Sequence, residues 1–356
     1  MPVIRLIAGS ATHTSFRALV LVQRTLTPAI SMVRVSDGVA LTSFSLTPFL
    51  PHTPAEQQVD QELINHEVSI YRLEATQLNP ETTHVLTATA GSGSATAVIK
   101  TLPMDLYGKS FTVAVGTCYY DGYHRDAHYL AALKSNWLGD PTYKILAGDN
   151  IYLDVVPAGD FGKGAFAETV GLYLQYWWRS GYSEVLAYQA SVFTSDDHEF
   201  WNNFPEVQPH VPRSIQGAKG EYAVAAQTCY RLFQAWLNPD PVIPGGLSFT
   251  LKIPPLNLFV AETRANRTKH GELVPSLLPD VELQAFEQWA AQLDGPGLFV
   301  LGQPLWIDTG DWRDHTPPDF ERQYAKIWRA IAKAPHDILI VSGDVHHSRL
   351  LQIALP

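Results

Sequence analysis

Three short motifs in the second half of the chain group carboxylate, imidazole and phenol side chains at close spacing. Residues 148–154 read Gly-Asp-Asn-Ile-Tyr-Leu-Asp, residues 195–199 read Ser-Asp-Asp-His-Glu, and residues 342–348 read Ser-Gly-Asp-Val-His-His-Ser. Clustered carboxylates without a counter-charge repel one another or take up protons, so this grouping favours a bound cation. Oxygen ligands suit Ca, Mg, Mn or ferric iron, whereas imidazole and the thiol of Cys118 suit Fe or Zn. The mixture indicates two or more different metals, which a shared carboxylate such as Asp149 could bridge.

Each of these motifs follows a short apolar stretch that predicts a buried β-strand. Such stretches occur at residues 111–115, 144–147, 191–194, 256–260, 298–301 and 338–341. Helix-like stretches lie between them, at residues 161–180, 221–237, 279–293 and 320–334. The alternation predicts an α/β fold with a largely parallel sheet. Since ligands bind beyond the carboxyl ends of such strands, we expect five strand ends to bring Cys, Asp, Tyr, His and amide side chains to one edge.

The first hundred residues have a different pattern. Short stretches rich in Val, Ile and Thr alternate with turn signals, at residues 16–22, 32–44, 68–78, 84–90 and 95–102, with one helix-like stretch at 55–65. This spacing predicts a small all-β sandwich of the fibronectin or immunoglobulin kind. We therefore expect a β-domain over residues 1–105 and a catalytic domain over residues 106–356.

Bulk properties narrow the class of protein. A chain of 356 residues, 46% hydrophobic and 17% charged, suits two folded domains. Its formal net charge of −10 opposes binding to a polyanion, so no nucleic-acid scaffold is expected. Two cysteines, Cys118 and Cys229, imply no disulfide framework, and Cys229 is expected in the core. Without an apolar run of about 18 residues or a leader segment, we expect a soluble, cytoplasmic protein with no membrane span.

Taken in this order and spacing, the three motifs resemble the signature blocks of the alkaline phosphatase D (PhoD-like) family of calcineurin-like metallophosphoesterases. Weaker matches are Glu262-Thr263-Arg264, residues 302–306, and Asp311 with Trp312. The resemblance runs from about residue 109 to the C-terminus, and the β-rich segment before it is similar to the family's N-terminal domain. Thr117-Cys118-Tyr119 stands where the wider superfamily has Asp-x-His, as in the D-type branch. Members of the family are often exported.

The resemblance implies a metallophosphoesterase sandwich that hydrolyses phosphate mono- or diesters by a metal-activated hydroxide. It assigns an iron-like metal to Cys118, Asp149, Tyr152 and His346, and a second metal to Asp149, Asp197 and Asp344. The metals implied are Fe³⁺ and Ca²⁺, with Mn, Zn or Mg as other options.

The same resemblance implies roles in binding and protonating the substrate. His198 would protonate the leaving group, because histidine titrates in the right range. Arg264 would bind a phosphate oxygen as a bidentate fork, and Gln303 and Asn202 would be supporting ligands. Of the adjacent His346 and His347, only one can face inward on an extended chain, and we expect His346.

Other interpretations remain open at this point. The chain ends ten residues after His346, whereas family members continue with further strands and a helix, so it is either truncated or minimal. A catalytically inactive metal-binding relative or an adhesion module is therefore the alternative function. The Asp196–Glu199 run could be a solvated acidic loop. A serine hydrolase is disfavoured, because the chain has no Gly-x-Ser-x-Gly elbow. The sequence gives no oligomeric state.

Overall fold

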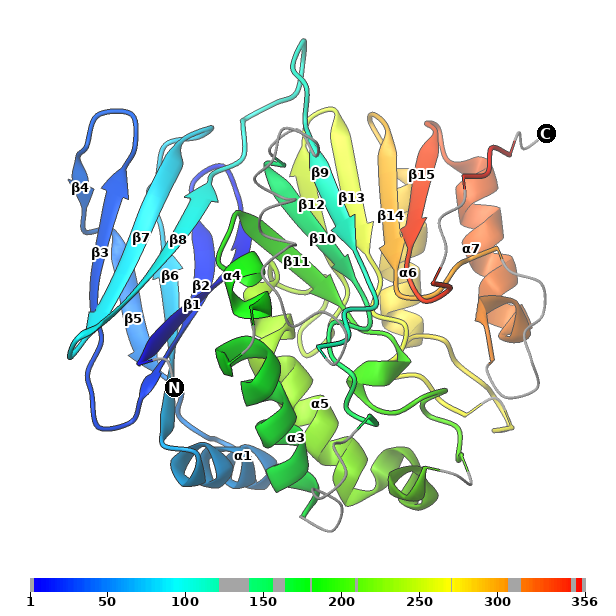
Figure 1. Ribbon diagram of the computed structural model, residues 1–356. Helices are drawn as coiled ribbons and strands as arrows, with labels where there is room; N and C mark the ends of the chain where they lie inside the picture. The colour runs from blue at the N-terminus through cyan, green and yellow to red at the C-terminus, as the bar shows by residue number, and fades with distance from the viewer. Residues whose placement is uncertain are drawn as a thin grey trace.

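The computed structural model describes residues 3–121, 141–155, 164–179, 181–208, 211–269, 271–306, 315–346 and 350–353. Two antiparallel sheets from the first hundred residues lie beside a set of parallel strands and helices formed by the rest of the chain (Figure 1). No described helix has the length and apolar character that crossing a bilayer requires.

The first part of the chain forms two four-stranded antiparallel sheets. Their strand orders are β1-β2-β6-β5 and β4-β3-β7-β8. The strands are β1 (Ile4–Ala11), β2 (Phe16–Gln23), β3 (Ala29–Arg34), β4 (Ala40–Leu41), β5 (Phe44–Pro48), β6 (Val68–Ala75), β7 (Thr83–Ala90) and β8 (Gly93–Lys100). The sequence predicts most of these strands but misses β1 and β5. Helix α1 (Pro54–Asn65) begins where Thr53 and Glu56 form a capping box and proline occupies the first turn.

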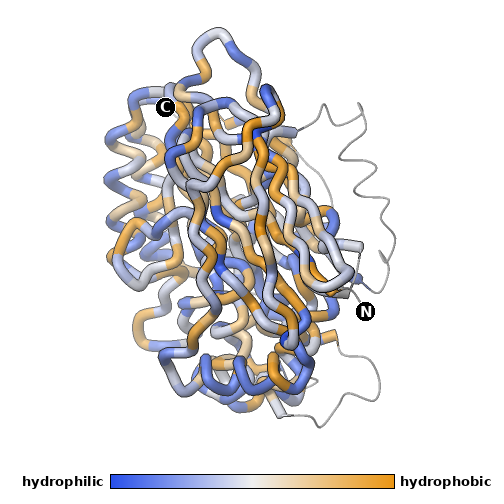
Figure 2. The backbone as a smooth tube through the Cα atoms, turned by 90° about the vertical axis from the view of Figure 1, so that its left-hand side faces the viewer, coloured by the Kyte–Doolittle hydropathy of each residue, from blue (hydrophilic) through white to orange (hydrophobic). Residues whose placement is uncertain are grey.

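Strands β1 and β2 are buried on both faces. Leu6 and Val20 on one face pack with residues of the second sheet, such as Leu86. Ile7 and Leu19 on the other face belong to a core that includes helix residues of the second part of the chain. Apolar stretches accordingly run along the strands through the interior (Figure 2). The two parts of the chain therefore share hydrophobic cores.

The second part of the chain is α/β, as the sequence predicts. Strands β9 (Val113–Gly116), β10 (Tyr143–Ala147) and β11 (Ala190–Thr194) form a parallel sheet in the order β11-β10-β9. A second sheet, in the order β12-β13-β14-β15, is parallel except at its first pair; its strands are β12 (Phe249–Ile253), β13 (Leu256–Val260), β14 (Gly297–Leu301) and β15 (Ile338–Ser342). The strands β10, β11 and β14 are buried along their whole length, which explains their uninterrupted apolar sequences.

Helices lie between these strands in the chain. They are α3 (Ala165–Leu174), a π-helical turn (Gln175–Arg179), α4 (Tyr182–Leu186), α5 (Glu221–Phe233), α6 (Asp280–Ala291) and α7 (Glu321–Lys333). Tyr173, Tyr176, Trp177 and Trp178 are buried in the core beside α5, as expected for helix packing. Cys229, on α5, is fully buried, in agreement with its predicted place in the core.

Candidate metal centre

The loops that follow β9, β10, β11 and β15 meet at one edge of the parallel strands. Backbone hydrogen bonds tie them together: Tyr119 N–H donates to the Asp149 carbonyl over 2.9 Å, and Leu153 N–H to the His198 carbonyl over 2.9 Å. Gly343, after β15, approaches β10 so closely that a Cβ atom there would lie 2.2 Å from the Ala147 carbonyl oxygen. Only glycine fits this position, which brings the residues after β15 against those after β10.

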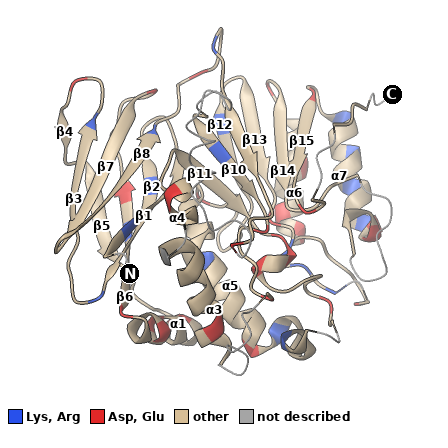
Figure 3. Cartoon of the chain, viewed as in Figure 1, with Lys and Arg blue, Asp and Glu red and all other residues tan. Residues whose placement is uncertain are grey.

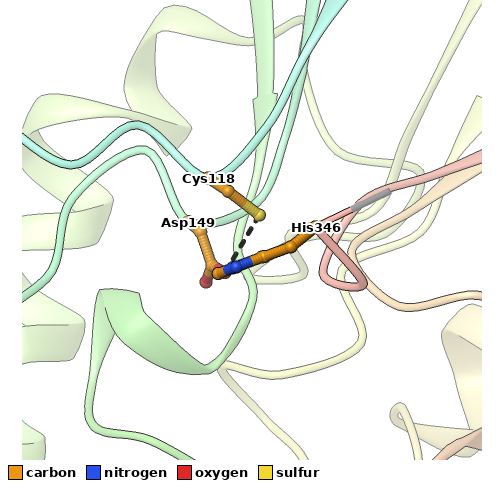
Figure 4. Close-up of side chains that lie close together, drawn as sticks. All are labelled: Cys118, Asp149 and His346. Atoms are coloured by element: carbon orange, nitrogen blue, oxygen red, sulfur yellow. Dashed lines mark hydrogen bonds between the residues drawn. The ribbon is translucent and has the colours of Figure 1, made fainter. Parts of the chain in front are cut away.

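Cys118, Asp149 and His346 form the first cluster of potential metal ligands (Figure 4). One ligand atom from each lies within 4.8 Å of the others, and the Cys118 Sγ–Asp149 Oδ2 distance is 3.5 Å. The Tyr152 hydroxyl lies 3.4 Å from His346 Nε2. The structure thus brings together the four residues to which the family resemblance assigns an iron-like metal.

A second cluster contains carboxylates alone. Asp149, Asp196, Asp197 and Asp344 each place one carboxylate oxygen within 4.8 Å of the others, so Asp149 belongs to both clusters. Acidic residues are visible in the loops below the central strands in Figure 3. Asp196 and Asp197 are buried, which contradicts the alternative of a solvated acidic loop. The family resemblance assigns Asp197 and Asp344 to the second metal but gives no role to Asp196.

The backbone is unusual at these residues. Cys118, Asp149, Asp344 and His346 all adopt positive φ angles, of 58°, 52°, 76° and 52°. Residues other than glycine seldom occupy this left-handed region, which elsewhere in the described chain is adopted by Glu67, Gln77, Glu81, Gln189 and Asn203. The conformation turns each chain sharply after its strand and directs the side chains toward a common point.

The pKa values of Cys118 and Asp149 in the first cluster are those of buried groups that lack a counter-ion. Burial, assisted by the Asp149 carboxylate, raises the pKa of the Cys118 thiol to about 12. Burial and the neighbouring Asp197 carboxylate raise the pKa of Asp149 well above its usual value. Such groups bind a metal by releasing their protons to solvent, because the cation stabilises the anionic forms. In the second cluster, Asp196 Oδ2 and Asp197 Oδ1 are buried without a hydrogen-bond partner among the described residues. Both clusters are therefore suited to hold a metal.

His198 lies beside both clusters and is held by a carboxylate. Its Nδ1 is 2.7 Å from Asp154 Oδ1, and Asp154 Oδ2 accepts a hydrogen bond from the Asn202 backbone N–H over 2.8 Å. The Tyr152 ring lies 4.1 Å from the imidazole. Burial alone would lower the pKa of His198, but the Asp197 and Asp154 carboxylates outweigh it and raise the pKa well above the ordinary value. The sequence assigns no role to Asp154, although it ends the 148–154 motif.

Glu199 connects the loop after β10 to the loop after β11. It is fully buried and accepts hydrogen bonds from the backbone N–H groups of Asp149 at 2.9 Å, Asn150 at 2.7 Å and Asp196 at 2.9 Å. Burial raises the pKa of Glu199 to about 7, against the opposing effect of these donors. The sequence places Glu199 in a motif but gives no sign that its partners are backbone amides.

The role predicted for Arg264 requires correction. Its side chain is 1% exposed; Nε donates to Asp196 Oδ1 over 2.6 Å and Nη1 donates to the Phe204 carbonyl over 2.8 Å. The guanidinium is therefore engaged inside the protein and does not offer a free fork to a phosphate.

The two supporting residues lie near the site. Gln303 is buried and its Oε1 accepts a hydrogen bond from Arg267 Nη2 over 2.7 Å, and the Asn202 backbone N–H donates to Asp154 Oδ2; their roles as ligands stay predictions. Trp201 is fully buried against Phe204 and Tyr222. Asp311, Trp312 and His347 lie outside the described residues.

Comparison with known proteins gives structural relatives at low sequence identity. No protein-family model and no curated protein sequence matches the chain. A structure of PhoD is 15% identical, with a TM-score of 0.67, and the match covers 96% of this chain and 71% of that one. The purple acid phosphatase PPD1 from yellow lupin (Lupinus luteus) seeds is 14% identical, with a TM-score of 0.52, over 87% of this chain and 52% of that one.

The chain therefore has the fold of metallophosphoesterases. Within this fold class, the structure of PhoD matches nearly the whole chain, which confirms at the level of the fold the resemblance seen in the motifs.

Proposed function

We propose that this protein is a metal-dependent phosphoesterase that hydrolyses phosphate mono- or diesters. The observation that carries the proposal is the pair of ligand clusters that share Asp149, with His198 beside them. The fold it shares with PhoD and a purple acid phosphatase supports the same class of reaction.

Two cations would occupy the two clusters. Cys118, Asp149, Tyr152 and His346 would hold the first, and Asp149, Asp197 and Asp344 the second. Thiolate, phenolate and imidazole suit ferric iron, whereas a carboxylate set suits Ca²⁺ or another hard divalent ion. When bound, the cations supply Lewis-acid activation of a phosphoryl oxygen and of the attacking water.

His198 would provide the proton that the leaving oxygen requires. Because Nδ1 faces Asp154, the other ring nitrogen, Nε2, is the one available to a substrate. The Asp154 carboxylate beside Nδ1 favours the protonated imidazole, which is the form that a general acid requires. Asp154 fixes the orientation of the ring, and Tyr152 packs against its face.

The first hundred residues would be a separate sandwich domain, with the boundary near residue 105. The strand orders β1-β2-β6-β5 and β4-β3-β7-β8 support this assignment, because they correspond to the two sheets of immunoglobulin-like folds. Its close packing on the second part of the chain suggests a support for the catalytic domain.

The test is hydrolysis of p-nitrophenyl phosphate and bis-p-nitrophenyl phosphate by purified protein supplied with iron and calcium. Asp149→Asn is the control, because it weakens the one ligand common to both clusters. Turnover that is lost in the folded variant supports the proposal, and the ratio of the two rates gives the preference for mono- or diesters. No turnover by folded, metal-loaded protein would overturn it in favour of an inactive metal-binding relative.

A further inference from the structure

We infer that Asp196 is a fourth carboxylate ligand of the second cation position, and that Arg264 holds it in the ligating orientation. The inference rests on the two-cluster site of the proposed function but not on the reaction. It assigns a cation-binding role to a residue that the sequence motifs leave without one, and a positioning role to Arg264.

Asp196 occupies a slot formed by two glycines. A Cβ atom at Gly148 would lie 2.7 Å from Asp196 Cβ, and one at Gly302 would lie 3.1 Å from Asp196 Cβ and 3.2 Å from its Oδ1. Any larger residue after β10 or β14 would displace the Asp196 side chain. The two strand ends thus leave room for this carboxylate in the immediate neighbourhood of Asp149.

Arg264 fixes one of the two carboxylate oxygens. Its Nε donates to Oδ1 over 2.6 Å, and its Nη1 is anchored on the Phe204 carbonyl. Both charged side chains are almost fully buried, with exposures of 1% and 0%. A charge-assisted hydrogen bond in this setting is strong and directional, and partners of this kind commonly orient metal ligands.

The other oxygen, Oδ2, has no hydrogen-bond donor among the described residues, although it is buried. An unsatisfied buried carboxylate oxygen is costly, and a second one, Asp197 Oδ1, belongs to the same cluster. A cation placed among Asp149, Asp196, Asp197 and Asp344 would satisfy both oxygens. Four carboxylates suit a hard divalent ion such as Ca²⁺, which takes six to eight oxygen ligands.

The test is calorimetric titration of chelator-treated protein with Ca²⁺. Asp196→Asn retains an oxygen that can accept from Arg264 Nε but replaces the other oxygen with an amide nitrogen. We expect the dissociation constant for Ca²⁺ to rise by at least about tenfold. The variant also loses the buried charge pair with Arg264, so the titration is run below the thermal midpoint of the chelator-treated variant. A rise of less than tenfold in folded Asp196→Asn would overturn the inference.

Glu282→Gln is the matched control. Glu282 is a fully buried carboxylate that accepts hydrogen bonds from backbone amides, including Ser248 N–H at 2.8 Å, and it is not a member of either cluster. Its substitution should leave the affinity for Ca²⁺ unchanged, and an equal loss there would show that the effect at Asp196 is only structural.

A second measurement covers the case in which Asp196→Asn does not fold. A crystal of the unaltered protein soaked in Mn²⁺, located by its anomalous scattering, should show the ion bonded to Asp196 Oδ2. An ion coordinated by the other carboxylates without Asp196 would overturn the inference. Neither experiment measures hydrolysis. An inactive protein would therefore contradict the proposed function without contradicting this inference.

Discussion

The antiparallel sheets of residues 4–100 and the strand ends of the α/β part are built in opposite ways. In the sheets the pairing is regular: β2 and β6, and likewise β7 and β8, pair in register over eight consecutive residues. Their buried side chains are almost all apolar, and within residues 3–100 the buried polar side chains are Ser10 and His84. The strand ends bury a cluster of carboxylates, two of whose oxygens have no donor among the described residues, and four candidate ligands there adopt left-handed conformations.

The difference indicates how the chain divides stability from function. Regular pairing and apolar burial in the sheets contribute stability without chemistry. The strand ends accept like-charge repulsion and backbone strain, which a bound cation would offset. Substitutions at the strand ends should therefore change cation binding or turnover more than folding, and substitutions in the sheets should do the reverse.

The largest effect is expected from His198→Asn. Loss of the general acid should lower turnover by about 10²- to 10⁴-fold for an alkyl phosphate. The loss should be smaller for p-nitrophenyl phosphate, because p-nitrophenolate leaves without needing a proton. Steady-state kinetics on both esters measure the difference. Equal losses on the two substrates would contradict the role of His198 as proton donor.

Glu199→Gln should weaken the connection between the two metal-binding loops. One of the two side-chain oxygens becomes an N–H donor that faces other N–H donors, at a cost of about 1–3 kcal/mol in unfolding free energy. Cation affinity should fall as well, since Asp149 and Asp196 lose their fixed spacing. Denaturant unfolding and calorimetry measure the two effects, with Glu282→Gln as the control. Glu199 would have a purely structural role if stability fell and affinity did not.

Cys118→Ser should affect the first cluster and leave the second unchanged. Replacing sulfur with a weaker, harder ligand should lower the affinity of the first position for Fe or Zn by about tenfold or more. Binding of Ca²⁺ at the carboxylate cluster should stay within about twofold, because Cys118 is not one of its members. Competition titrations with each metal measure this. A parallel loss of Ca²⁺ affinity would mean that the clusters do not act as two positions.

The smallest effect is expected from His84→Leu, which tests the antiparallel sheets through the pH dependence of stability. His84 is 1% exposed, and burial lowers its pKa. Above about pH 6.5, the pKa of histidine in an unfolded chain, His84 is neutral in both the folded and the unfolded protein. Its protonation therefore contributes nothing to the unfolding free energy at pH 7. As pH falls below that value, the unfolded chain binds a proton that the folded chain resists, and wild-type stability declines.

The leucine variant should lack this decline. Between pH 7 and pH 5, the unfolding free energy of the wild-type protein should fall by no more than about 2 kcal/mol relative to that of His84→Leu. Each pH unit contributes about 1.4 kcal/mol per proton, and denaturant unfolding measures the difference. Calcium affinity should be unchanged. A pH dependence that is identical in the two proteins would place the acid sensitivity elsewhere.

The sequence predicts the part of the site that depends on strand order. Apolar stretches followed by Asp, His and Cys place Cys118, Asp149, Asp197 and His346 together, because parallel strands end at one edge. The sequence does not predict contacts that depend on three-dimensional approach. Arg264, which follows β13, contacts Asp196, which follows β11, and no local pattern distinguishes an arginine that meets a buried carboxylate from one that meets a substrate.

The fold divides in the same way. Continuous apolar sequences predict β10, β11, β13, β14 and β15, although β15 is only partly buried, with Leu339 57% exposed. The sequence does not predict β1, although this strand is also buried on both faces. The small residues Ala8, Gly9 and Ser10 interrupt its run of large apolar side chains. The sequence also misses β12, which pairs antiparallel at the edge of its sheet.

The most direct test of the account is the recovery of activity when metal is returned to stripped protein. Chelator-treated protein would be titrated with iron and calcium together while hydrolysis of p-nitrophenyl and bis-p-nitrophenyl phosphate is followed. The account predicts that activity appears only with metal and saturates at about two equivalents per chain, one for each cluster. Activity that survives complete removal of metal, or folded protein that binds both metals and hydrolyses neither ester, would contradict it.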